Sequence, residues 1–296
     1  MSLINLTQHR LNMKPDSIKK VVSDFGKTLA SLGKIAFFSK PADIPYDKEN
    51  KEKTLVILGN GPSLKGTIEN DIEKLVSYPL MAVNFAVNAP DFIKLRPCYY
   101  LLADGYFFNG LKRDPNVRKL WANLSNVSWE MTLFIPKKYS HLVKALLMNA
   151  GKNIKTATFN MTPVEGFKWV KHAIFSASLG MPRPRNVMIP AIMTGIAMGY
   201  KKILLFGADH TWTKTLDVDD ENFVVTVQPH FYEDNEEECR RVRDTYRGIR
   251  LHQVLESMSI AFKSYWEIKD YARAKGVEII NGTPGSMIDA FSRGSF

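Results

Sequence analysis

From Thr54 onward the sequence alternates short apolar runs with segments of helical spacing, and this alternation restricts the fold more than any other feature. The apolar runs have the length of buried strands, whereas the segments between them repeat apolar residues every three or four positions. The predicted strands are 54–58, 79–84, 98–104, 131–136, 153–159, 201–209 and 277–281. The predicted helices are 68–78, 117–124, 139–148, 168–175 and 188–199, with a long helix ending at 274 and a short one at the C-terminus. This order predicts an α/β fold with a doubly wound, mostly parallel, Rossmann-like sheet.

Residues 1–53 follow a different pattern. Six apolar residues recur at helical spacing while lysines fall mostly on other faces, and a charged stretch broken by prolines follows. The apolar residues are Ile18, Val21, Val22, Phe25, Leu29 and Leu32. We therefore divide the chain into an N-terminal basic amphipathic helix with a linker (1–53) and a main domain (54–296). Such a helix packs on the main domain or on a partner chain, or it lies on an anionic membrane surface, and the pattern leaves these alternatives open.

Charge and cysteine content limit the classes of partner and compartment. Lys and Arg number 40 against 30 Asp and Glu, and this net charge of +10 favours anionic partners. The positive charge is dispersed and no nucleic-acid-binding module is evident, so nucleic acid is not an expected partner. Cys98 and Cys239 lie far apart, which excludes a disulfide framework and indicates a reducing compartment.

No apolar run approaches the roughly 20 residues of a membrane-spanning helix, and no signal peptide is evident. We expect a cytoplasmic protein, with peripheral contact to the inner membrane and self-association left open.

A glycine-containing turn, Gly59-Asn60-Gly61-Pro62-Ser63, follows the first predicted strand. In doubly wound folds ligands bind at the carboxyl ends of strands, where helix N-termini present free N–H groups to phosphate. The glycines would allow close approach of the ligand, and Ser63 would cap the helix or bind a phosphate oxygen. The third glycine of a dinucleotide fingerprint is replaced by Leu64, so a plain strand-to-helix turn is the alternative.

Polar residues also end other predicted strands, namely Asn84, Asp104 and Asp209. Because the carboxyl ends of parallel strands share one edge of a sheet, we expect these side chains to lie near the turn at Asn60.

A long polar connection follows the strand at 201–209 and predicts a lid at about 210–240. It contains His210, Trp212, His230 and Tyr232, and the aromatic side chains can stack on a base or a sugar. His230 is the favoured general base, whereas His210 is equally compatible with a structural role.

Two further motifs in the sequence have ordinary alternatives. Asp217-Val218-Asp219 resembles the DxD of metal-dependent sugar transferases, but its acidic neighbours favour a solvated turn, and no metal site is expected. Arg183 and Arg185 precede a predicted helix and suit a phosphate or carboxylate, or form a solvated basic turn.

Four segments resemble the bacterial lipo-oligosaccharide sialyltransferases of glycosyltransferase family 42: TLVILGNGPSLK, AVNF, AIMTGIAMGYKKILLFGADH and NGTPGSM. The resemblance extends from about Thr54 to Ile288. It implies a single nucleotide-binding domain of variant GT-A type with a lid, acting as an inverting, metal-independent transferase without a cofactor. The implied donor is a CMP-activated acidic sugar such as sialic acid or a Kdo-like sugar. The implied acceptor is an oligosaccharide or lipid-linked glycan of the cell surface, as in lipopolysaccharide or capsule biosynthesis.

The resemblance also implies roles for individual residues. The residues expected to bind the nucleotide either match nucleotide contacts of the family or lie at the ends of the matched segments. They are Asn60, Gly61, Pro62, Ser63, Asn84, Asp104, Asn186, Asp209, His210, Pro284, Gly285 and Ser286. Asp104 stands where the family has asparagine. Asn186 stands at the threonine of a Thr-Ser-Gly element whose other positions are Val187 and Met188 here. His230 and Tyr232 correspond to the catalytic histidine and to the tyrosine that assists the leaving group.

Two other functions remain open from the residues. One is a Mg²⁺-dependent phosphotransferase of the pterin diphosphokinase-like kind, with Asp104 and Asp209 on the metal. The other is a non-catalytic subunit that binds a glycan or a nucleotide.

The assignment of His230 predicts a specific separation of binding from turnover. We expect His230→Ala to retain nucleotide binding, measured by calorimetry, and to lose sugar transfer, because the attacking hydroxyl loses its base. Unchanged turnover would remove His230 from the mechanism.

Overall fold

The computed structural model describes residues 15–148, 153–226 and 248–296. Its centre is an eight-stranded sheet in the order β10-β9-β6-β1-β2-β3-β4-β5. Each pairing in this sheet is parallel. The strands are β1 (Thr54–Leu58), β2 (Leu80–Val83), β3 (Tyr99–Leu101), β4 (Met131–Pro136), β5 (Ile154–Phe159), β6 (Lys202–Phe206), β9 (Glu278–Asn281) and β10 (Ser292–Arg293). The predicted doubly wound parallel sheet is confirmed.

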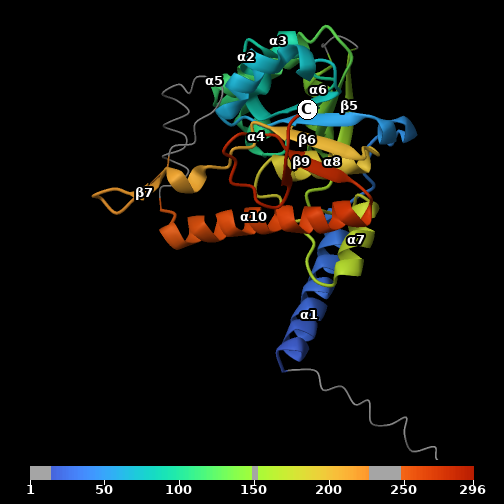
Figure 1. The fold of residues 1–296 in the computed structure, drawn as a ribbon, viewed down its shortest axis with the longest axis vertical. Helices are drawn as coiled ribbons and strands as arrows, with labels where there is room; N and C mark the ends of the chain where they lie inside the picture. The colour runs from blue at the N-terminus through green and yellow to red at the C-terminus, as the bar shows by residue number, and fades with distance from the viewer. Residues whose placement is uncertain (1–14, 149–152, 227–247) are drawn as a thin grey trace, which may run out of the picture.

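Helices cover both faces of the sheet, and the alternation of side chains along β1 shows why. Leu55 and Ile57 point into the layer with α7 (Lys168–Ser176), α8 (Met188–Ala197) and α10 (Leu251–Ala274). Val56 and Leu58 point to the opposite face, where α2 (Ser63–Leu75) packs, and α5 (Pro115–Ser125) covers the neighbouring part of that face. Figure 1 shows β6 and β9 of this sheet between α2 above and α10 below. The other α-helices of the described residues are α1 (Pro15–Phe38), α3 (Phe92–Leu95), α4 (Tyr106–Asn109) and α6 (Ser140–Leu146). Among the described helices, none is both long and apolar enough to cross a membrane.

The strand-to-helix pattern was predicted closely, but the short C-terminal helix was wrong. Residues 282–296 contain no helix, and β10 adds to the edge of the sheet instead. Side chains take over the backbone hydrogen bonds in this region: Thr283 Oγ1 accepts the Ala208 N–H, and Asn281 Oδ1 accepts the Thr283 N–H. Local side-chain bonds of this kind compete with helix formation.

The chain reverses its direction of winding between β1 and β6. It proceeds outward through β2 to β5 and then returns to place β6 on the other side of β1. The carboxyl ends of β1 and β6 therefore form the topological switch point, where ligands bind in doubly wound folds.

The glycines at the switch point allow two turns to touch. Gly61 N–H donates to the Gly207 carbonyl at 2.8 Å, and Gly207 has a left-handed backbone (φ 66°). A Cβ on Gly61 would collide with the Asp209 carboxylate and the Gly207 carbonyl. The close contact between the turns after β1 and β6 therefore requires glycine at position 61. The sequence alone did not indicate this contact.

This contact predicts opposite effects for two glycine substitutions. We expect Gly61→Ala to lower the free energy of unfolding by about 1–3 kcal/mol, because the added methyl group has no space. Gly66→Ala in α2 is the matched control: outside the backbone of its own helix and its chain neighbours, no atom lies within 4 Å of the added Cβ, so we expect about 0.5–1 kcal/mol of stabilisation. Urea denaturation measures both, and equal changes of the same sign would contradict the contact.

Candidate functional site

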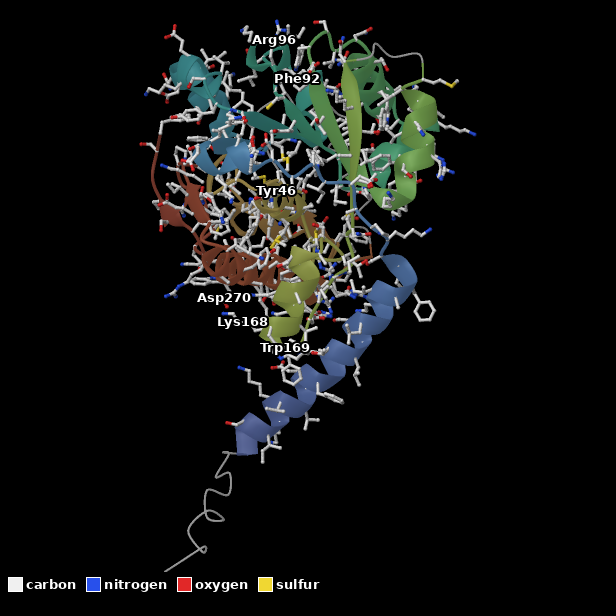
Figure 2. All side chains as sticks on the ribbon, turned by 90° about the vertical axis from the view of Figure 1, so that its right-hand side faces the viewer. Tyr46, Phe92, Arg96, Lys168, Trp169 and Asp270 are labelled. Carbon is white, nitrogen blue, oxygen red and sulfur yellow. The ribbon has the colours of Figure 1, made fainter. Side chains whose placement is uncertain are left out.

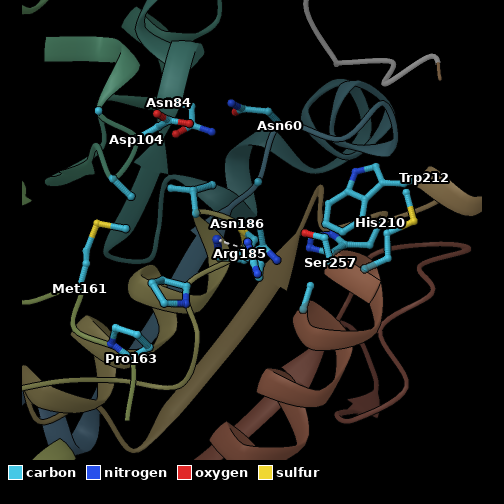
Figure 3. A pocket seen from close by; sticks show the side chains of 18 of the residues that line it. Asn60, Asn84, Asp104, Met161, Pro163, Arg185, Asn186, His210, Trp212 and Ser257 are labelled. Atoms are coloured by element: carbon cyan, nitrogen blue, oxygen red, sulfur yellow. Dashed lines mark hydrogen bonds between the residues drawn. The ribbon is translucent and has the colours of Figure 1, made fainter. Parts of the chain in front are cut away.

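A cleft of about 1430 Å³ opens at the switch point. Residues that follow four neighbouring strands line it: Asn60 after β1, Asn84 after β2, Asp104 after β3, and Asp209 and His210 after β6. Figure 3 shows Asn60, Asn84 and Asp104 grouped along one side, with His210, Trp212 and Ser257 on another. The structure therefore brings together the strand-end residues that the sequence placed at one edge. The wall supplied by α10 had no recognisable sequence signal, because its residues lie within an ordinary helical repeat.

The turn after β1 uses most of its hydrogen-bonding groups inside the protein. The Ser63 backbone N–H donates to Asp209 Oδ1 at 3.2 Å, and Ser63 Oγ donates to Asp209 Oδ2 at 2.8 Å. Asp209 thereby caps α2 from across the switch point, where the positive end of the helix dipole stabilises its carboxylate. Burial raises the pKa of Asp209, and the bonds from Ser63 oppose that rise. Ser63 and the first N–H of α2 are thus engaged by a carboxylate, and the Asn60 side chain is the polar group of this turn that faces the cleft.

Three buried amide atoms at the cleft have no hydrogen-bond partner among the described residues: Asn60 Oδ1, Asn84 Oδ1 and Asn186 Nδ2. Asn60 Nδ2 donates to the Val83 carbonyl at 3.3 Å, and this hydrogen bond orients the Asn60 amide. A buried polar group without a partner costs about 1–3 kcal/mol, so each of these atoms favours a bound ligand or an ordered water. The cleft wall therefore holds two unpartnered acceptors and one unpartnered donor among the described residues.

A backbone N–H and a tyrosine hydroxyl fix the orientation of Asn186. Asn186 Oδ1 accepts the Met188 backbone N–H at 3.0 Å and the Tyr265 hydroxyl at 2.8 Å, so Nδ2 is left for the cleft. The same hydroxyl lies 2.6 Å from His210 Nε2, which donates to it when the imidazole carries its proton on that nitrogen. Tyr265 lies within α10 and was not predicted, since nothing in a helical repeat marks one buried tyrosine as part of a site.

His210 itself is buried and neutral. The ring centroids of His210 and Trp212 lie 4.2 Å apart. Burial lowers the pKa of His210 to about 3. An imidazole with such a pKa is a weak base at neutral pH, so the geometry gives His210 a positioning role behind Asn186.

Two residues at the cleft have strained backbones. Asn84 and His210 both have positive φ (51° and 53°), a region that residues with a side chain seldom occupy. Such strain persists where the surroundings impose it and is common at ligand-binding sites.

Cationic side chains reach the cleft from three separate elements. Lys34 comes from α1, Lys137 and Lys138 follow β4, and Arg185 precedes α8. Lys137 also pairs with Asp43 at 2.6 Å. Side chains of this charge suit a ligand that carries phosphate or carboxylate.

Other predicted site residues lie elsewhere or outside the described part. Pro284 and Gly285 are exposed and do not line the cleft. Ser286 is buried, and its Oγ donates to the Ala208 carbonyl at 2.6 Å, so it supports the segment after β6 from beneath. His230 and Tyr232, with most of the predicted lid, lie outside the described residues, and their roles stay predictions.

The acidic DxD segment forms the end of a small hairpin. Asp217 lies in β7 (Leu216–Val218), which pairs with β8 (Val224–Thr226), and Asp219 Oδ1 accepts the N–H groups of Glu221 and Phe223. Asp219 therefore closes a turn. Within the described chain, no group of three or more His, Cys, Asp or Glu residues is arranged to hold a metal.

No protein-family model and no curated protein matches the chain. Among solved structures, the chain is similar to one described as the MAf glycosyltransferase from Magnetospirillum magneticum AMB-1, with a TM-score of 0.52 and 13% sequence identity. The match covers 93% of this chain and 38% of that one, so the chain spans little more than a third of its neighbour. At this identity the likeness shows a shared fold. The resemblance to family 42 stays a prediction.

The burial of His210 predicts a specific dependence of stability on pH. In the unfolded chain an imidazole titrates near pH 6.5, whereas folded His210 stays neutral down to about pH 3. Between these values the unfolded state binds the extra proton, so the free energy of unfolding falls as pH falls below 6.5. We expect His210→Gln to reduce that slope between pH 6.5 and 5 by about 1 kcal/mol per pH unit.

The measurement is urea denaturation across this pH range. His252→Gln, at an exposed position of α10, controls for the loss of an imidazole elsewhere. Parallel pH profiles for the wild type and His210→Gln would contradict a buried neutral imidazole.

Proposed function

We propose that the chain is a glycosyltransferase that binds a nucleotide-activated sugar in the cleft at the switch point. The observation that carries the proposal is the set of three buried, unpartnered amide atoms at Asn60, Asn84 and Asn186. The two carbonyl oxygens suit hydroxyl or amine donors, which a nucleoside supplies. The Asn186 N–H lies next in sequence to Arg185 and suits an anionic oxygen. The fold shared with a glycosyltransferase supports the same class.

The donor that we propose is a CMP-activated acidic sugar. Such a donor carries a phosphate and a sugar carboxylate, and both suit a cleft reached by Lys138 and Arg185. The volume of about 1430 Å³ exceeds the roughly 300–1,000 Å³ of ordinary ligand pockets and leaves room for an acceptor glycan.

In the proposed reaction the acceptor hydroxyl attacks the anomeric carbon as the bond to the phosphate oxygen breaks and CMP leaves. His230 takes the hydroxyl proton, and Tyr232 with the Asn186 amide donates hydrogen bonds to the departing phosphate. The low pKa of His210 favours a different histidine as the base. Attack from the opposite side inverts the anomeric centre.

We propose that the transfer needs no metal. A Mg²⁺ site at Asp104 and Asp209, as in the pterin diphosphokinase-like alternative, would need carboxylate oxygens that Ser63 now occupies at Asp209. Releasing them would uncap α2, which disfavours that alternative.

Calorimetric titration with CMP, UDP, GDP and ADP in the absence of metal tests the donor class. We expect CMP to bind most tightly, and preference for a diphosphate would contradict the proposal. Asn186→Asp keeps an oxygen for Met188 and Tyr265 but replaces the donor with a charged acceptor. We expect it to weaken CMP binding by about 10–100-fold.

Asn70→Asp in α2 is the matched control, since it makes the same change of charge at an exposed position. Equal CMP affinity of Asn186→Asp and the control would remove the Asn186 amide from the binding site. Slow hydrolysis of CMP-sialic acid or CMP-Kdo by the protein distinguishes an enzyme from a subunit that only binds.

A further inference from the structure

Helix α1 is attached to the body through small and polar residues. Thr28 Oγ1 accepts the Phe167 backbone N–H at 2.9 Å, and Ser31 Oγ donates to the Glu165 carbonyl at 3.0 Å and accepts its N–H at 2.9 Å. One turn further on, Ile35 packs against the main core. These contacts tie α1 to the segment before α7 and fix which face of the helix points outward.

The outward face carries the apolar residues that the sequence marked. Their exposed fractions lie between 44% and 66%. We call this set the apolar stripe: Ile18, Val21, Val22, Phe25, Leu29 and Leu32. Figure 2 shows α1 projecting from the body. A surface helix normally buries its apolar face, so an exposed apolar stripe on a helix held by its polar face indicates an external partner.

The charges around the stripe decide between two kinds of partner. The spacing of Ile18, Val22, Phe25, Leu29 and Leu32 would suit a coiled coil with a second copy. In a coiled coil the flanking positions carry complementary charges, but here they hold Lys19, Val21, Gly26, Thr28 and Gly33, and the body already uses Thr28. These positions offer no acidic group to pair with the lysine of another copy.

Outside the stripe, α1 carries four lysines against two aspartates, Asp16 and Asp24. Lys19, Lys20, Lys27 and Lys34 lie away from the stripe, and within the described chain none forms an ion pair. Trp169, on α7 beside α1, is 75% exposed (Figure 2). An apolar stripe about 100° wide, with lysines on the side of the helix away from it and an aromatic residue nearby, matches a helix that lies in the surface of an anionic bilayer.

We propose that α1 docks the protein on anionic lipid, with the apolar stripe inserted at the level of the headgroups and the lysines attracted to the negative surface. This inference is independent of the reaction in the cleft. It concerns residues that do not line the cleft, apart from Lys34.

Flotation of the full chain with vesicles tests the proposal. We expect the wild type to float with vesicles of phosphatidylglycerol and phosphatidylcholine, and more weakly with phosphatidylcholine alone. The double variant Phe25→Glu, Leu29→Glu should bind at least about tenfold more weakly, because two inserted side chains are lost. Replacing Lys19 and Lys20 by Gln should weaken binding to the anionic vesicles by about fivefold for each lysine.

The matched control is Ile93→Glu in α3, since Ile93 is 72% exposed and its neighbour Phe92 lies at the end of the molecule opposite α1 (Figure 2). It should float as the wild type does.

Phe25 and Leu29 face outward, so the double variant should keep the wild-type melting temperature, which shows that it is folded. Failure of the wild type to float, or equal flotation of the double variant, would overturn the proposal. A wild-type dimer in sedimentation velocity that the double variant dissociates would assign the stripe to a second copy and overturn it as well.

Discussion

The contact between the turns after β1 and β6 is the constraint on which the site depends. Asp209 binds the backbone and hydroxyl of Ser63, and Gly61 donates to Gly207, so the first turn of α2 is held against the end of β6. A buried carboxylate is costly unless it accepts hydrogen bonds, and the N-terminus of α2 supplies both the donors and a favourable dipole. Asn60 is therefore presented at a fixed place in the cleft. The glycines serve this contact, and only glycine allows the two backbones to approach so closely.

Hydrogen bonds within the protein orient two of the amides of the cleft. Val83 orients Asn60, while Met188 and Tyr265 orient Asn186, with His210 behind Tyr265. An amide held in this way loses little freedom on binding, which is how a site gains affinity from few contacts. Because burial keeps His210 neutral, the positive charge at the cleft comes from the cationic side chains that line it, such as Arg185 and Lys138.

Helix α1 links the cleft to the surface that we assign to lipid. Its polar face is bound to the segment before α7, its apolar stripe is exposed, and its C-terminal end supplies Lys34 and Phe38 to the cleft wall. A helix that binds a bilayer through the stripe would thus hold the cleft near that bilayer, and this placement agrees with the acceptor that we propose.

The sequence by itself determined the elements of the sheet and the edge at which the site lies. The runs TLVIL and MTLFIP became β1 and β4 at the predicted residues, and Asn84, Asp104 and Asp209 meet at one edge, because strand periodicity and parallel pairing follow from local pattern. Only the tertiary structure decided which polar groups are hydrogen-bonded inside the protein and which are left to bind a ligand. Ser63 donates to a residue 146 positions away, and Asn186 accepts from one 79 positions away. Thr283 of the C-terminal segment bonds to Leu205 in β6 and to Ala208 just after it, and this segment forms no helix. These partners are distant in the chain, and a hydrogen bond between distant residues leaves no periodic signal in either segment.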